Sequence, residues 1–309
     1  MNEIAQLILD AGRAGIELAL FVLLPVMIVM LTLMRLLESR GVLDHVVRLC
    51  SPLLKPFGIP GLGIFAMIQV LFVSFAAPVA TLAMMDRGGI SSRHIAATLA
   101  LVLTLAQANV VFPMATVGLD VWGTILISLG CGIIAAALTY HLFGRNLSTQ
   151  EVDQKLDCDH EDGSSLFAVI QRAGKDAFDI SIAALPMLVL ALVVVYSLRA
   201  LGVIEQLEGL LAPLFASLDL PQQTLLPVLA KYIAGGMAMM GVTVDFINQE
   251  LISATELNRL AGFLIHPMDL AGVAVMMSAG RRVAAVVLPA VLGALCAILL
   301  RTLLHVLLF

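Results

Sequence analysis

A histidine and an aspartate stand three positions apart in a strongly apolar part of the sequence, within His266-Pro267-Met268-Asp269. Residues at positions i and i+3 share one face of a helix, so the two side chains are expected to lie together. Counted from a helix start at Thr255, His266 lies about 17 Å along the axis, near the middle of a bilayer. Ionisable groups there cost roughly 2.5–3.5 kcal/mol on insertion scales, which predicts a functional role. Histidine titrates near neutral pH, so His266 and Asp269 are candidates for coupling to a proton or cation.

A second polar group, formed by Thr104, Gln107 and Asn109, stands before Pro113 in the first half of the chain. Thr104 and Gln107 share a helix face, whereas Asn109 points elsewhere unless the helix unwinds locally. Proline removes a backbone donor, so Pro113 and its counterpart in the second half are expected to break their helices. Two broken helices with polar groups at mid-membrane predict a solute or ion site between them. The same groups would also serve to hydrogen-bond neighbouring helices, and the pattern leaves both interpretations open.

Two long apolar segments, residues 60–86 and 221–247, are interrupted near their middles by Ala76-Ala77-Pro78 and by Gly235-Gly236. Each segment either crosses the membrane once or folds into a re-entrant hairpin with the break at its tip. Non-helical backbone at that depth is tolerated only when it is buried in protein or lines a wet cavity. Small residues at both breaks, with Ser74 beside the first, would leave backbone amides free to hold a ligand.

Lys231 stands four residues before Gly235 in the second interrupted segment. Three roles are open for it: contact with an anionic group of a substrate, pairing with Asp269 or Asp245, or extension to the membrane surface. The predicted substrate or ion site consists of Lys231 together with Ser74, Thr104, Gln107, Asn109, Gly235, Gly236, His266 and Asp269.

The composition places the chain in a membrane. Of 309 residues, 61% are hydrophobic and 13% charged, with a mean hydropathy of +1.04, whereas a soluble domain carries about 25% charged residues. We expect no removable signal peptide at the start of this sequence. The net charge of −5 and the absence of a basic run give no sign of nucleic-acid binding. No ATP-binding or hydrolase motif and no metal-ligand spacing appears, so we expect neither an enzyme nor a cofactor or metal.

The sequence matches itself without a gap when it is shifted by 161 residues, which brings Gly41-Val42 onto Gly202-Val203. We expect an N-terminal segment over residues 1–11, one repeat over 12–148, an acidic linker over 149–172 and a second repeat over 173–309. Each repeat is expected to hold a first helix, an interfacial stretch, the interrupted segment, and third and fourth helices. The expected bounds are Ala14–Met34, Val42–Gly58, Ser91–Gly118 and Val121–Phe143 in repeat one, and Ile180–Leu198, Val203–Leu220, Ser253 or Thr255 to Gly280 and Val283–Leu308 in repeat two.

The distribution of Lys and Arg favours the hairpin over a full crossing. If every long segment crosses, the two sides of the membrane carry nine and seven basic residues, almost without bias. If the interrupted segments are hairpins, one side gathers twelve and the other four, namely Arg13, Arg199, Arg259 and Arg301. The positive-inside rule therefore predicts three full spans per repeat, a second repeat inverted relative to the first, a cytoplasmic linker and both termini outside.

The duplicated dipeptides resemble the Gate family, also called nucleoside-recognition domain proteins. They are Leu24-Pro25, Gly41-Val42, Pro52-Leu53 and Ile59-Pro60, with counterparts Leu185-Pro186, Gly202-Val203, Pro213-Leu214 and Leu220-Pro221. Related units occur in concentrative nucleoside transporters, in ferrous-iron transporters fused to a GTPase and in spore-membrane proteins. The resemblance implies transport without naming a substrate, because no convincing copy of the nucleoside-contacting motifs is present.

We therefore expect an all-helical, multi-pass protein of a bacterial-type inner membrane that acts as a secondary transporter for a small solute or ion. A homodimer is plausible for so small a carrier. The other hypothesis is a non-transporting scaffold or accessory subunit, whose polar mid-membrane groups bind the helices of a partner.

Overall fold

The protein is entirely helical over the residues that its computed structural model describes, 2–149, 166–202 and 222–309. The predicted interfacial stretch Val203–Leu220 and most of the predicted acidic linker lie outside these residues. Among the described residues, four helices are long and apolar enough to cross a membrane: Ala5–Leu37, Ser92–Val117, Val121–Phe143 and Val287–Leu308. A fifth crossing is counted if His45–Phe57 and Gly61–Phe72, which meet at an angle of 107°, form one span.

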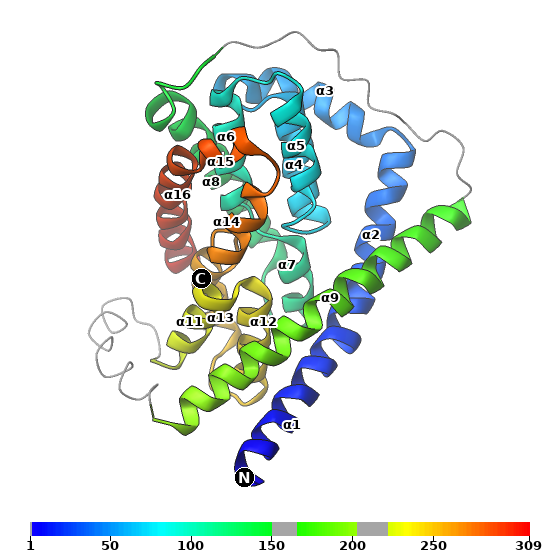
Figure 1. Ribbon diagram of the computed structural model, residues 1–309, viewed down its shortest axis with the longest axis vertical. Coiled ribbons are helices and arrows are strands. Elements are labelled where there is room, and N and C mark those ends of the chain that lie inside the picture. Colours follow the sequence, from blue (N-terminus) through cyan, green and yellow to red (C-terminus); the bar gives the residue numbers. More distant parts are fainter. Residues whose placement is uncertain (1, 150–165, 203–221) are drawn as a thin grey trace.

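Two long helical rods cross along one side of the molecule (Figure 1). The first joins α1 (Asn2–Glu17), a π-helical turn η1 (Leu18–Leu23) and α2 (Leu24–Ser39), and the second is α9 (Leu166–Ala200). We call these two rods the frame helices. Both extend beyond the predicted first helices, and so take in the predicted N-terminal segment and the end of the predicted linker. The apolar pattern marks only the part of a helix suited to lipid, whereas backbone hydrogen bonding continues past it.

The two frame helices pack against each other in antiparallel directions. Gly15 of the first rod lies against Val189, while Arg35, farther along, pairs with Asp176 at 2.6 Å. Moving forward along one rod therefore means moving backward along the other. The predicted 161-residue shift pairs these two frame helices with each other, and an inverted repeat would require their opposite directions.

Each interrupted segment forms two short helices that pack side by side. In the first, α4 (Gly61–Phe72) and α5 (Pro78–Arg87) are held by a 2.8 Å hydrogen bond from Thr81 Oγ1 to Gln69 Oε1, which places the turn between them at residues 73–77. We call α4–α5 the first hairpin; Pro78 opens its second arm. The second hairpin is α11 (Leu225–Ala234) and α12 (Gly236–Asn248), which meet at Gly235 with a φ of +92°. A positive φ at this turn favours glycine. The helices α3 (Val42–Leu54) and η2 (Lys55–Phe57) precede the first hairpin.

The predicted third helix is broken into two helices in each repeat. Repeat one has α6 (Ser92–Thr104) and α7 (Ala108–Met114) with a break at 105–107, and repeat two has α13 (Ala254–Leu264) and α14 (Leu270–Met277) with a break at 265–269. Ser91 caps α6, and Ser253, rather than Thr255, caps α13 in a capping box with Glu256. Pro267 lies in the second break, whereas Pro113 lies inside α7. The first break therefore precedes Pro113, contrary to prediction.

The fourth helices of the two repeats also run antiparallel to each other. They are α8 (Val121–Leu138), which continues as a π-helical turn η4 (Thr139–Phe143), and α16 (Val287–Leu308), which follows the short α15 (Arg281–Ala285). Gly293 near the start of α16 contacts Thr139 at the end of α8, and Phe309 contacts Gly123 near its start. The single turns η3 (Ala115–Val117) and η5 (Gln222–Thr224) complete the described elements.

The buried apolar residues that the structure describes form two cores, and each core contains parts of both predicted repeats. The first core joins the first hairpin and α6 to α14, and the second joins the second hairpin and α13 to α7. At the first break, Leu105 belongs to the first core and its neighbour Ala106 to the second. At the second break, Ile265 belongs to the second core and Met268 to the first. Each broken helix thus leaves one core and enters the other at its break. The polar residues of the breaks lie where the two cores meet.

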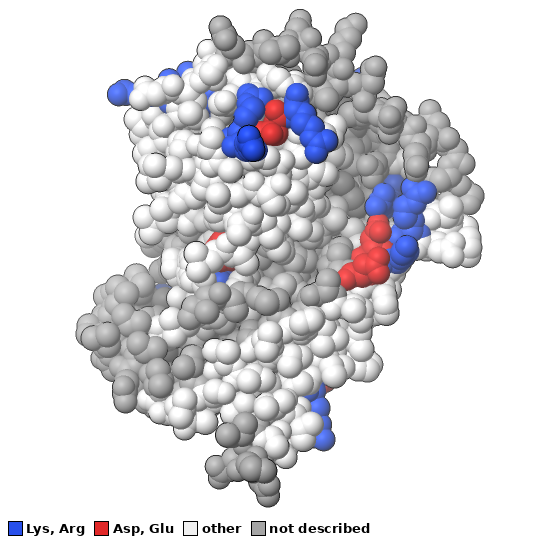
Figure 2. All heavy atoms as spheres, in the orientation of Figure 1, with Lys and Arg blue, Asp and Glu red and all other residues white. Residues whose placement is uncertain are grey.

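The outer surface suits contact with lipid. Large apolar side chains are strongly exposed on several helices, among them Phe21, Trp122, Leu288 and Leu307, a pattern that would be unfavourable in water. Figure 2 shows a face that is mostly free of charge, with most of its visible Lys and Arg gathered in the upper half. The chain is therefore a multi-pass membrane protein.

Candidate functional site

An ion pair between Lys231 and Asp269 lies at the second break. Lys231 comes from the last turn of α11, and its Nζ donates to Asp269 Oδ2 and to the backbone carbonyl of His266. The two side chains are 0% and 4% exposed. Asp269 also caps α14, because its Oδ1 accepts a hydrogen bond from Gly272 N at 2.7 Å. Asp245, the other acid considered for Lys231, instead accepts from the Tyr196 hydroxyl at 3.1 Å.

His266 is fully buried beside this ion pair but does not bond to Asp269. Its Nδ1 accepts from Met268 N at 3.2 Å, and its Nε2 has no hydrogen-bond partner among the described residues. The expectation that His266 and Asp269 share a helix face was wrong, because residues 265–269 are not helical. The break turns the carbonyl of His266, rather than its ring, toward the lysine.

The first break meets the second hairpin directly. Gln107 at the start of α7 lies so close to Gly236 that a Cβ added to the glycine would stand 2.1 Å from Gln107 Nε2. Asn109 Nδ2 lies 3.2 Å from Met237 Sδ, and Asn109 Oδ1 is buried with no partner among the described residues. The backbone unwinds just before α7 and brings both amide side chains to the second hairpin. The helical spacing required such unwinding if Asn109 was to point the same way as Gln107. The structure brings Gln107, Asn109, Gly235, Gly236, Lys231, His266 and Asp269 into one region.

Arg301 of α16 is a functional candidate that the sequence analysis missed. Its side chain is 0% exposed, with Nη1 donating to the Thr104 carbonyl at 2.8 Å and Nη2 to the Ala261 carbonyl at 3.4 Å. Thr104 is the last residue of α6, and Ala261 lies in the last turn of α13. The guanidinium thus lies at the C-terminal ends of the two helices that break, where the helix dipole favours a cation.

The charge count in the sequence analysis treated Arg301 as a loop residue, and this was wrong. Arg301 stands within an apolar run, seven residues before Leu308. The rule that singled out His266, an ionisable group deep in an apolar segment, would have found it. The Thr104 hydroxyl donates to the Ala100 carbonyl at 2.8 Å, so within this cluster Thr104 acts through its backbone.

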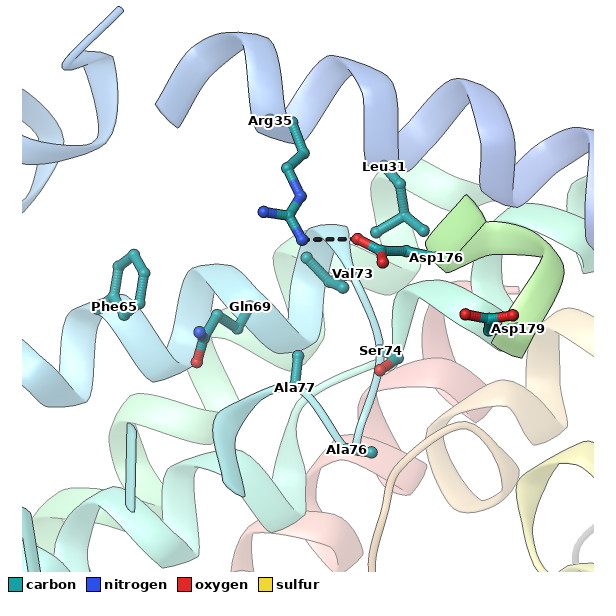
Figure 3. A pocket seen from close by; sticks show the side chains of 10 residues that line it. All are labelled: Leu31, Arg35, Phe65, Gln69, Val73, Ser74, Ala76, Ala77, Asp176 and Asp179. Carbon is teal, nitrogen blue, oxygen red and sulfur yellow. Dashed lines mark hydrogen bonds and ion pairs between the residues drawn. The ribbon is translucent and has the colours of Figure 1, made fainter. Parts of the chain in front are cut away.

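Ser74 lies elsewhere, in the wall of a cavity of about 520 Å³ between the first hairpin and the frame helices (Figure 3). The hairpin contributes Phe65, Gln69 and residues of its tip, and the frame helices contribute the ion pair of Arg35 and Asp176 together with Asp179. Figure 3 shows Asp179 apart from this ion pair. The cavity has the size of a small-molecule site and combines an aromatic ring with amide, hydroxyl and charged groups.

The three charged residues of the cavity were not predicted. Asp176 and Asp179 precede the expected start of the second repeat's first helix at Ile180, so they had been placed outside the membrane segment. Only the packing of α9 against α2 brings them to Arg35. Their spacing of three residues on one helix was a usable sign that they share a face.

Comparison with known proteins identifies part of the chain and its fold. Residues 20–132 match the family described as Gate, nucleoside recognition. A structure of CNTnw in an inward-facing, substrate-bound state is 16% identical, with a TM-score of 0.67 over 99% of this chain and 83% of that one. A substituted CNTnw in an outward-facing state is 15% identical, with a TM-score of 0.67 over 99% of this chain and 84% of that one. No curated protein sequence matches the chain.

Proposed function

We propose that this chain, which carries a Gate nucleoside-recognition domain and has the fold of a concentrative nucleoside transporter, is a secondary transporter for a small polar solute. The observation that carries the proposal is the cavity of about 520 Å³, which opens between the tip of the first hairpin and two charged frame helices. A solute there would contact both the first hairpin, which belongs to the first core, and the frame helices, which belong to the second. Relative movement of these parts would then expose the solute to one side or the other.

The arrangement of the repeats supports this proposal. Equivalent helices run antiparallel, and each apolar core combines the hairpin of one repeat with a broken-helix half from the other. If the two repeats exchanged conformations, the protein would open to the other side of the membrane with a similar set of contacts. The two states would then have similar energies, as alternating access requires. We accordingly propose an inverted topology, in which both hairpins are re-entrant and the linker faces the cytoplasm of a bacterial-type cell. Removing the buried Arg301 from the charge count leaves twelve basic residues against three, which strengthens the bias.

We expect a cysteine at Ala76, on the exposed tip of the first hairpin, to react with a membrane-impermeant thiol reagent from either side of the membrane. In a transporter, the wall of the cavity is exposed first to one side of the membrane and then to the other. The measurement is labelling of Ala76→Cys in oriented proteoliposomes, in a background that lacks Cys50, Cys131, Cys158 and Cys296. The matched control is Gly88→Cys at the base of the same hairpin, which should react from one side only.

Labelling of Ala76→Cys from one side alone would contradict alternating access and favour a scaffold. Co-purification of the chain with another membrane protein in fixed stoichiometry would add weight to that alternative. Binding gives a separate measurement, with uridine and adenosine as the first probes because of the matched family. A bound nucleoside at about 100 times its dissociation constant stabilises the folded state by roughly 2.7 kcal/mol, which a thermal unfolding scan detects.

A further inference from the structure

We propose that the ammonium group of Lys231 occupies a cation site formed by Asp269 and the His266 carbonyl, so that the chain carries a permanently attached cation where a free one would otherwise bind. The inference rests on the proposed function in one respect only: transport by this chain would need no metal cation bound at the Lys231–Asp269 site. The site itself is a property of the folded protein and is tested without transport.

The oxygen atoms around Lys231 Nζ are those that hard metal cations prefer. A carboxylate oxygen comes from Asp269, and a backbone carbonyl comes from His266 in the non-helical segment that follows α13. Carboxylates and unwound carbonyls bind alkali and alkaline-earth cations in proteins, and transporters place such carbonyls at the ends of half-helices. Here the protein's own ammonium donates to both oxygens.

Two of the helix ends around the site favour positive charge at this point. The site follows the C-terminal end of α13, and Lys231 itself stands in the last turn of α11. Both helix ends present the negative pole of the helix dipole. Because the Asp269 carboxylate is almost fully buried, removing the lysine would leave a buried negative charge without its ion-pair partner.

The neighbouring hairpin causes little steric hindrance at this site. Gly235, which has no side chain, brings the turn of the second hairpin near Asp269; even an added Cβ would remain 3.6 Å from Asp269 Oδ1. A truncated lysine would therefore vacate a polar, oxygen-lined space rather than an apolar cavity. Such a space admits a hydrated monovalent cation.

We expect Lys231→Ala to make the protein's thermal stability dependent on a small cation. Purified protein in detergent is heated in NaCl, KCl, LiCl or choline chloride at matched ionic strength. In choline chloride the thermal midpoint of Lys231→Ala should fall by about 10 °C, as expected for a broken buried ion pair. At least one of the small cations should restore a large part of that loss in a saturable manner. The wild type should show the same midpoint in all four salts.

The matched control is the double variant Lys231→Ala/Asp269→Asn, which keeps the vacated space but lacks the negative charge. It should show no preference among the salts. Equal midpoints for Lys231→Ala in all four salts would overturn the proposal, and so would the same salt preference in the double variant. If Lys231→Ala cannot be recovered in any of the salts while the double variant folds, the vacated site takes no cation and the proposal fails.

If neither variant folds, the wild type decides the matter. Stabilisation of the wild type by Na⁺, K⁺ or Li⁺ that Asp269→Asn abolishes would show that a metal cation displaces the ammonium, and would overturn the proposal. The same midpoint in all salts supports an occupied site. None of these results depends on transport, so one-sided labelling at Ala76 would reject the proposed function and leave this inference standing.

Discussion

Arg301→Met is expected to lower the free energy of unfolding by about 2–4 kcal/mol, although Arg301 lies in a helix that already has the composition of a membrane span. The Thr104 carbonyl would lose its guanidinium partner in a buried position, which costs roughly 1–3 kcal/mol. The C-terminal ends of α6 and α13 would also lose a cation, worth up to about 2 kcal/mol in a partly buried site. Thermal or denaturant unfolding of the purified protein measures the change.

Two further variants separate this role from the general effect of removing an arginine. Arg281→Met removes an exposed arginine at the start of α15 and should change stability by less than about 0.5 kcal/mol. Arg301→Lys should be intermediate, because an ammonium can replace the charge but does not span the two carbonyls. Wild-type stability in Arg301→Met would show that the carbonyls of the two broken helices need no cation.

Gly272→Ala is expected to disrupt the second break, at a cost of about 3 kcal/mol or more. A Cβ at this position would lie 1.9 Å from the Pro267 carbonyl oxygen, far inside contact distance. The backbone cannot easily move away, because Gly272 N donates to Asp269 Oδ1 at 2.7 Å and the same Pro267 oxygen accepts from Asp269 N at 2.9 Å. Overpacking of this kind costs about 1–3 kcal/mol in ordinary cores, and more where the backbone is held.

The matched control for this prediction is Gly130→Ala in α8, where an added Cβ would meet nothing within 4 Å. Alanine there should leave the protein as stable as the wild type or slightly more so, by about 0.4–1 kcal/mol. The measurement is again thermal unfolding, with Lys231 accessibility to an amine reagent as a second readout. If Gly272→Ala unfolds at the wild-type temperature and keeps Lys231 protected, the close approach to Pro267 has no structural importance.

Several features of the fold could be predicted from the sequence because their causes are local. The apolar composition predicted a membrane protein, and residue type predicted a helix start at Ser91 and, as one of two alternatives, at Ser253. Prolines predicted that both third helices are discontinuous, and Pro267 does lie in the second break. The exact break in repeat one was placed too late, because Pro113 is tolerated near the end of the short α7.

The tertiary structure decided which distant groups meet. Lys231 had three possible roles in the sequence, and the choice of Asp269 depends on a contact between residues 38 positions apart across a turn of positive φ. The cavity depends on α9 passing beside α2, which brings Asp176 to Arg35 across 141 positions. Local propensity cannot set such contacts, because they follow from how whole helices pack.

The sequence by itself determined that the chain enters a membrane and that polar groups accompany its discontinuous helices, and it predicts that the chain is built twice. Only the tertiary structure decided that each core combines one repeat's hairpin with the other repeat's broken helix, and that Arg301 lies inside rather than in a loop. The physical reason is that hydrophobic pattern reports how apolar a segment is, not what covers it. In a chain so uniformly apolar, an apolar side chain can face either lipid or another helix, and only the packing of the helices decides between them.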